Sequence, residues 1–202
     1  MSLMVYDCEI KNAIPERGRP PIDGIQYCAG WQDFAGMGVA VICAYVWPEG
    51  YRIFMADNFD AFRALAADDN TLCVGYNNHV FDDHLVAATL GFKIPEHRSY
   101  DLLGAIRVAR GQHPRAVSGP SLHQLCQANF LPGKSGNGAF APILWQKGKI
   151  GQVVDYALND CRQTVLLLEL AMAGRLRDPD SGRILNVTPP HLLPQETVGV
   201  IS

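Results

Sequence analysis

The order of apolar and polar residues predicts strands first and mostly helices afterwards. Residues 3–10 alternate and are rich in β-forming side chains, and residues 38–47 are almost wholly apolar with several β-branched side chains. Both segments are predicted to be strands. Residues 51–56 follow a Pro-Glu-Gly turn and are expected to pair with residues 38–47 as a hairpin, and residues 71–76 are expected to form a further strand.

Capping residues and helical periodicity identify the helices. We predict helices over residues 58–65, 80–90, 102–110, 121–130 and 152–176. Ser121 and Gln124 have the spacing of a capping box, Gly91 is expected to end the second helix, and Asp101 is expected to cap the third. A short strand is also predicted over residues 183–187. This order predicts an α/β fold with a central mixed β-sheet flanked by α-helices.

Composition is consistent with one globular domain. The chain has 202 residues, of which 48% are hydrophobic and 18% are charged. We expect one domain over residues 1–177 and a Pro-containing C-terminal extension over residues 178–202. The longest apolar run, residues 39–47, is too short to span a bilayer, and acidic residues interrupt the N-terminus before a secretory segment forms. A cytoplasmic protein without a membrane partner is therefore expected.

The six cysteines include no C-x-x-C pair, so we expect small buried side chains in a reducing compartment rather than a zinc or disulfide site. The net charge of −3 argues against a general nucleic-acid coat. Between Lys93 and Lys149, however, eight basic residues stand against two acidic ones. This stretch is compatible with ordinary solvated helix faces or with a surface that follows phosphates.

The first candidate for chemistry is the pair Asp7 and Glu9 in the N-terminal strand. Side chains two residues apart share a face of a strand, so these carboxylates project together about 6–7 Å apart. They repel each other unless a positive group lies between them, and a divalent cation is the usual solution. The alternative is that one of them is exposed at a sheet edge.

Two further polar groups lie at the ends of predicted elements. Asp82 and Asp83 open a helix, where the helix dipole favours acidic residues for structural reasons alone. Adjacent helical positions diverge by about 100°, so at most one of the two faces a shared site. Tyr156 and Asp160 lie four residues apart on one helix face, at the border of its apolar stripe, and form either a satisfied polar pair or part of a site.

Three short motifs therefore occur in order along the chain: Asp7-x-Glu9, Asn77-x-x-x-Phe81-Asp82 and Tyr156-x-x-x-Asp160. Together they resemble the motifs of the DEDD 3′→5′ exonuclease superfamily, over roughly residues 4–174. The tyrosine resembles that of the DEDDy branch, which includes RNase D and the proofreading domains of DNA polymerases. The resemblance implies a ribonuclease-H-like fold and assigns the second motif to Asp82, with Asp83 at the surface or behind the site.

The resemblance also implies an activity. It implies a two-metal-ion 3′→5′ exonuclease that releases 5′-mononucleotides from DNA or RNA, with single-stranded 3′ ends favoured. The sequence does not indicate any protein partner. Two Mg²⁺ or Mn²⁺ ions would be held by the carboxylates Asp7, Glu9, Asp82 and Asp160. Two ions can activate water and stabilise the leaving oxygen without a conventional acid–base pair. Tyr156, with an ordinary pKa near 10, is expected to orient the attacking water rather than to act as a base.

Nucleic-acid contacts are expected from Asn77, Arg107, Arg110 and Lys134, although Asn77 is equally compatible with a plain turn at a strand end. Four aromatic residues could stack on bases, but core packing is the default expectation for them: Trp31, Phe34, Tyr76 and Trp145. Two other functions remain open. One is a catalytically silent nucleic-acid-binding module on the same fold, and the other is a phosphoesterase that acts on small nucleotides.

Overall fold

A mixed five-stranded sheet forms the centre of the computed structural model, which describes residues 2–133 and 138–190. The strand order is β3-β2-β1-β4-β5. The strands are β1 (Ser2–Ile10), β2 (Val39–Trp47), β3 (Gly50–Phe54), β4 (Thr71–Gly75) and β5 (Ser99–Asp101). β1, β2 and β3 are antiparallel neighbours, whereas β4 and β5 run parallel to β1. The predicted mixed α/β architecture is confirmed.

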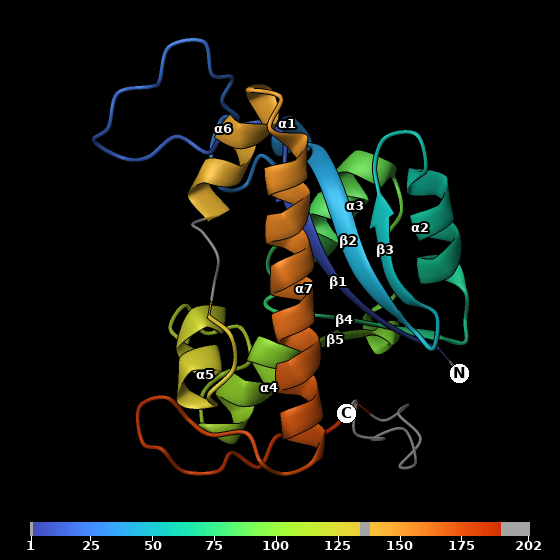
Figure 1. Cartoon of the computed structure of the whole chain (residues 1–202), viewed down its shortest axis with the longest axis vertical. Coiled ribbons are helices and arrows are strands. Elements are labelled where there is room, and N and C mark those ends of the chain that lie inside the picture. Colours follow the sequence, from blue (N-terminus) through green and yellow to red (C-terminus); the bar gives the residue numbers. More distant parts are fainter. Residues whose placement is uncertain (1, 134–137, 191–202) are drawn as a thin grey trace.

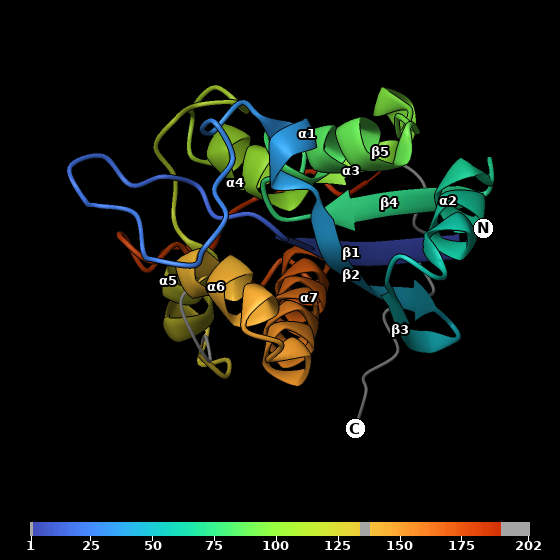
Figure 2. The ribbon, with the colours of Figure 1, turned by 90° about the horizontal axis from the view of Figure 1, so that it is seen from above.

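Helices cover both faces of this sheet (Figures 1 and 2). They are α1 (Phe34–Met37), α2 (Phe59–Ala67), α3 (Asp82–Leu90), α4 (Leu102–Ala109), α5 (Leu122–Ala128), α6 (Ala141–Gln146) and α7 (Ile150–Met172), with short 3₁₀ turns η1 (Glu96–Arg98) and η2 (Gly138–Phe140). α1, α2 and α3 pack on one face, and α4, α5, α6 and α7 pack on the other. Figure 1 shows α7 running across β1 and β2.

The alternation of side chains in β1 divides its residues between the two cores. Tyr6 and Cys8 are buried on the face of α2 and α3, whereas Val5 is buried on the face of α4, α5 and α7. A strand covered on both faces needs apolar residues at successive positions, which explains why β2 is an almost continuous apolar run.

The local signals at the helix ends are confirmed where they involve capping. Ser121 and Gln124 form the predicted capping box, Asp101 accepts a hydrogen bond from the Gly104 N–H, and Gly91 ends α3 in the left-handed conformation. β5, α1 and α6 were not predicted, because elements of three to six residues are too short to show a period.

The strand predicted over residues 183–187 is wrong. Within the described chain, this segment makes one isolated bridge, between Ile184 and Arg177. It is fixed instead by burial of Leu185 and Val187 in the core that contains α4, α5 and α7. The described part of the C-terminal segment therefore packs onto the rest of the chain.

Two expectations concern the whole chain. All six cysteines are free and buried, as expected for small apolar side chains. Among residues 2–133 and 138–190, no helix combines the length and the apolar character needed to cross a membrane.

Candidate active site

The candidate site begins where β1 extends past its parallel neighbour. β1 pairs with β4 only from Ser2 to Val5, and its pairing register with β2 shifts between Glu9 and Ile10. Asp7 and Glu9 lie in this extension, with Asp7 partly exposed and Glu9 buried. Like Val5, they project to the face of the sheet that α7 covers.

Asp82 enters the site from the neighbouring strand. The chain leaves β4 at Gly75 and turns through Asn77, whose φ of 68° is left-handed, before α3 begins at Asp82. A Cβ at Gly75 would lie 2.6 Å from the Cβ of Asn78, so this turn requires glycine. The Cys8 N–H then donates a hydrogen bond of 3.0 Å to Asp82 Oδ1. The second motif thus lies against the peptide group that joins Asp7 to Cys8.

Asp83 has different surroundings, although it is adjacent in sequence. It accepts hydrogen bonds from the hydroxyl of Tyr6 and from Ser99 Oγ, the latter at 2.7 Å. Asn78 Nδ2 donates to the same Ser99 Oγ at 2.9 Å. Tyr6 lies on the opposite face of β1 from Asp7, so Asp83 belongs to a polar network behind the site. The two adjacent aspartates thus have different hydrogen-bond partners.

The third motif comes from α7. Tyr156 and Asp160 are both buried, and Cys161 Sγ donates to the Val5 carbonyl at 3.2 Å, which fixes this part of α7 against β1. Burial, followed by the charges of Asp160, Glu9 and Asp7, raises the pKa of Tyr156. The phenol therefore stays protonated at neutral pH. The 3₁₀ turn η2 passes over it, since a Cβ at Gly138 would lie 3.1 Å from the Tyr156 hydroxyl.

The electrostatics of the site are dominated by carboxylates of one sign. Burial and repulsion from Asp83 raise the pKa of Asp82 from 3.8 to about 7. The charges of Asp7 and Glu9, after burial itself, also raise the pKa of the Cys43 thiol on the adjacent strand β2. A cation bound among these carboxylates would lower the pKa values of both Asp82 and Cys43.

The donor atoms of Asp7, Glu9, Asp82 and Asp160 are carboxylate oxygens, which suit Mg²⁺ and Mn²⁺. Their chemistry fits the cations that the sequence motifs imply. In the described ranges, however, no three His, Cys, Asp or Glu side chains are grouped closely enough to hold one ion as they stand. Binding an ion here would require these side chains to converge on it.

Three of the four residues expected to contact nucleic acid have hydrogen-bond or ion-pair partners within the fold. The Asn77 N–H donates to Asp101 Oδ1 at 2.8 Å, and Asn77 Oδ1 accepts from Arg107 at 3.2 Å. Arg107 is buried and also donates to the carbonyls of Pro114 and Ser118. Asn77 and Arg107 thus hold the turn after β4 and the loop after α4.

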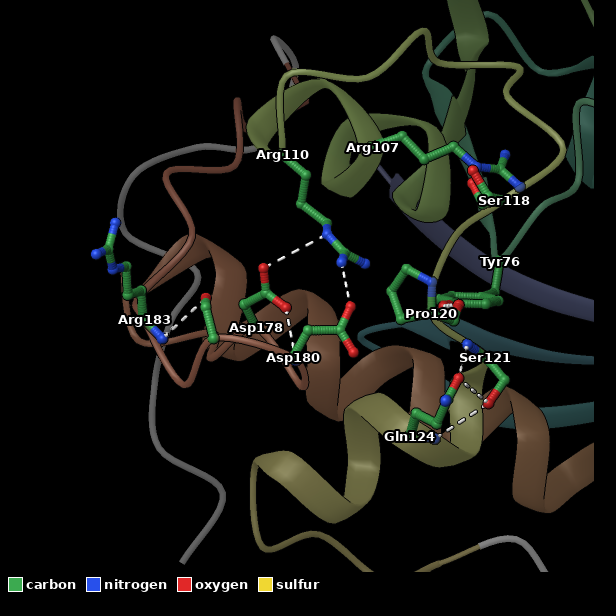
Figure 3. Close-up of polar contacts among 11 residues, drawn as sticks. Tyr76, Arg107, Arg110, Ser118, Pro120, Ser121, Gln124, Asp178, Asp180 and Arg183 are labelled. Carbon is green, nitrogen blue, oxygen red and sulfur yellow. Dashed lines mark hydrogen bonds and ion pairs between the residues drawn. The ribbon is translucent and has the colours of Figure 1, made fainter.

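Arg110 likewise joins two parts of the fold. Figure 3 shows its guanidinium reaching Asp178, at 3.4 Å, and Asp180 in the segment after α7. The basic stretch is therefore less available to a ligand than its charge suggests. Lys134, the fourth predicted contact, lies outside the described residues.

Solved structures provide a comparison for the whole fold. The family B DNA polymerase from the hyperthermophilic archaeon Pyrobaculum calidifontis matches 92% of this chain and 26% of its own chain, with a TM-score of 0.56 and 16% identity. E. coli exonuclease I in complex with a dT13 oligonucleotide matches 84% of this chain and 44% of its own, with a TM-score of 0.47 and 14% identity. No model of a protein family matches the sequence, and no curated protein matches it.

The fold is ribonuclease-H-like. The likeness to the polymerase confirms this part of the sequence prediction. The chain spans about a quarter of the polymerase and less than half of exonuclease I. The likeness accordingly concerns the arrangement of the sheet and its helices.

Proposed function

We propose that this protein is a metal-dependent 3′→5′ exonuclease that hydrolyses phosphodiester bonds of nucleic acid and releases 5′-mononucleotides. The observation that carries the proposal is the hydrogen bond from the Cys8 N–H to Asp82, because it joins the second acidic motif to the strand of the first. The charges of Asp7, Glu9 and Asp160 contribute to the raised pKa of Tyr156, which supports the proximity of the third motif to the first. The ribonuclease-H-like fold is consistent with this reading.

In the proposed reaction, the oxygen of a water molecule bonds to phosphorus and the bond from phosphorus to the 3′ oxygen breaks. The 3′ oxygen leaves as a hydroxyl after gaining a proton. Held by Asp7, Glu9, Asp82 and Asp160, Mg²⁺ or Mn²⁺ would supply the positive charge that acidifies water at neutral pH and offsets charge on the phosphate. Without that charge the four carboxylates repel a phosphate, so substrate binding itself should depend on the cation.

Tyr156 has a role that follows from its protonation. Because its pKa is raised, the phenol is a poor proton acceptor at neutral pH and a good hydrogen-bond donor. We infer that it orients the attacking water or a phosphate oxygen. Tyr156→Phe should then lower kcat more than it raises KM.

The experiment that tests this function follows the degradation of labelled single- and double-stranded DNA and RNA with Mg²⁺ or Mn²⁺. The wild type should shorten them from the 3′ end and stop with chelator or at a blocked 3′ end. Asp7→Asn should lower the rate of degradation by about a hundredfold or more. Mutating a residue that only hydrogen-bonds a metal ligand already costs about 10–100-fold in activity or metal affinity. The matched control is Asp155→Asn, an exposed carboxylate next to Tyr156 on α7, which should keep full activity.

The other outcomes identify the alternatives. Salt-dependent binding without products would support a catalytically silent nucleic-acid-binding module. Release of phosphate from mononucleotides, with oligonucleotides left intact, would support a small-nucleotide phosphoesterase. Cleavage that ignores both chelator and a 3′ block would overturn the proposal.

A further inference from the structure

α1 packs against α3, the helix that begins at Asp82 (Figure 2). Aromatic side chains of the two helices and of the loop before α1 form a cluster there. The Phe81 ring, one residue before Asp82, lies 6.3 Å from the Trp31 ring and 6.0 Å from the Phe34 ring. Phe34 stacks on His84 at 5.2 Å. The cluster therefore links the loop before α1 to the first turn of the helix that carries the second acidic motif.

Trp31 differs from the other members in its exposure. The residue is 69% exposed, whereas Phe34 and Phe81 are half-buried. The Trp31 and Phe81 rings meet at 66°, so they do not stack on each other and most of the indole surface remains available to a flat ligand. An exposed ring face of this kind can stack on a flat aromatic ligand.

The loop that carries Trp31 is braced rather than loose. The Asp33 N–H donates to the Gly30 carbonyl at 3.0 Å, which closes a turn around Trp31. The Asp33 carboxylate accepts from the N–H groups of Ala29 and Gly36, at 2.8 and 2.9 Å. A ligand that stacks on Trp31 thus meets a side chain whose backbone is already ordered, and little conformational entropy is lost on binding.

We infer that Trp31, supported by Phe81, is a stacking surface for an unpaired base of the nucleic-acid substrate. This inference rests on the proposed function, because Trp31 contacts Phe81, the residue before Asp82, and Asp82 is one of the carboxylates at which a phosphate would react. A nucleobase is the flat, aromatic group that a strand held at Asp82 would bring here. Stacking on an aromatic ring tolerates every base and requires the base to be unpaired, so this surface selects single-stranded ends of any sequence.

The test compares oligonucleotides that carry one abasic site at each of the last four positions with the unmodified strand. The wild type should show a KM about tenfold higher for one abasic position, the loss expected for one stacked base. Trp31→Ala should raise KM for the unmodified strand by the same factor, and its KM should no longer differ between the unmodified and the abasic strands. Trp31→Phe should keep most of that difference in KM. Val117→Ala, an exposed apolar residue in the loop after α4, is the matched control and should behave as wild type.

The outcomes separate this inference from the function on which it rests. Degradation by Trp31→Ala with unchanged KM and unchanged discrimination overturns the stacking surface and leaves the exonuclease intact. If the wild type degrades nothing, the proposed function fails, and binding of single-stranded oligonucleotide decides the inference. Loss of affinity in Trp31→Ala but not in Val117→Ala then supports stacking, and equal affinities refute it.

Discussion

Asp82 and Asp83 differ in what compensates their charges. Asp83 accepts hydrogen bonds from the hydroxyls of Tyr6 and Ser99 and from Asn78 Nδ2. Asp82 accepts one from the Cys8 backbone, is buried, and faces the charge of Asp83, and its pKa rises to about 7. The charged form of Asp82 therefore costs stability in the metal-free protein.

The first prediction concerns the pH dependence of stability. Because the folded-state pKa of Asp82 lies above its ordinary 3.8, the native protein binds the proton more tightly than the unfolded chain between pH 3.8 and about 7. The contribution of Asp82 to the free energy of unfolding therefore falls as pH rises through this window. Asp82→Asn should remove that slope and make the metal-free protein more stable at pH 7, while abolishing nuclease activity.

Urea unfolding at pH 5 and pH 7 in chelator measures this effect. Asp155→Asn on the exposed face of α7 is the control and should keep the wild-type slope. An Asp82→Asn protein with an unchanged slope would show that another group carries the pH dependence.

The second prediction concerns Tyr6. Tyr6→Phe removes a hydroxyl that donates to the Asp83 carboxylate. A hydrogen bond to a charged group contributes about 1.5–3 kcal/mol, so the free energy of unfolding should fall by that amount. Tyr51→Phe, at an exposed position of β3, should change it by less than about 0.5 kcal/mol. Equal effects in denaturant unfolding of the two variants would contradict the network.

At the scale of the elements, local capping decides where α5 begins. The Ser121 hydroxyl accepts from the Gln124 N–H, and the Gln124 side chain accepts from the Ser121 N–H, as Figure 3 shows. The Pro120 carbonyl just before this box also accepts from the Tyr76 hydroxyl at the end of β4. A capping box between residues close in sequence thus sets the start of α5, which packs against α7.

The third prediction tests that cap. Ser121→Ala should lower the free energy of unfolding by about 1 kcal/mol, because an N–H at the start of α5 loses its acceptor. Ser118→Ala is the control, since Ser118 contributes its backbone carbonyl, and not its side chain, to Arg107. Thermal and urea unfolding of both variants measure the difference. A similar loss in Ser118→Ala would show that the cap adds nothing of its own.

The elements also show how far sequence reasoning reaches. The two-residue period of a strand predicted that Asp7 and Glu9 share a face of β1. The four-residue spacing on a helix predicted that Tyr156 and Asp160 share a face of α7. Nothing local predicted β5, because three residues become a strand only through pairing with β4. The acceptors of Arg107 were not predicted for a similar reason, since they lie in loops whose course depends on tertiary packing.

At the scale of the whole molecule, β1, α3 and α7 bring carboxylates from distant parts of the chain towards one place. The fourth prediction is that a cation couples these three elements. Mn²⁺ at about a hundred times its Kd should raise the free energy of unfolding by about 2.7 kcal/mol, with a matching rise in Tm. Asp7→Asn should remove most of this rise, and Asp155→Asn should keep it. A rise of the same size in Asp7→Asn would place the ion elsewhere.

The sequence by itself determined the residue types and the local order: alternating strands, capped helices, and acidic pairs whose spacing sets them on one face. Local conformation follows from short-range sterics and hydrogen bonds, which adjacent residues specify. Only the tertiary structure decided which partners Asp82 and Asp83 have, that Arg107 and Arg110 hold loops, and that Trp31 stays exposed. These outcomes depend on where β4 ends and on which surfaces bury one another, and such contacts join residues far apart in the chain.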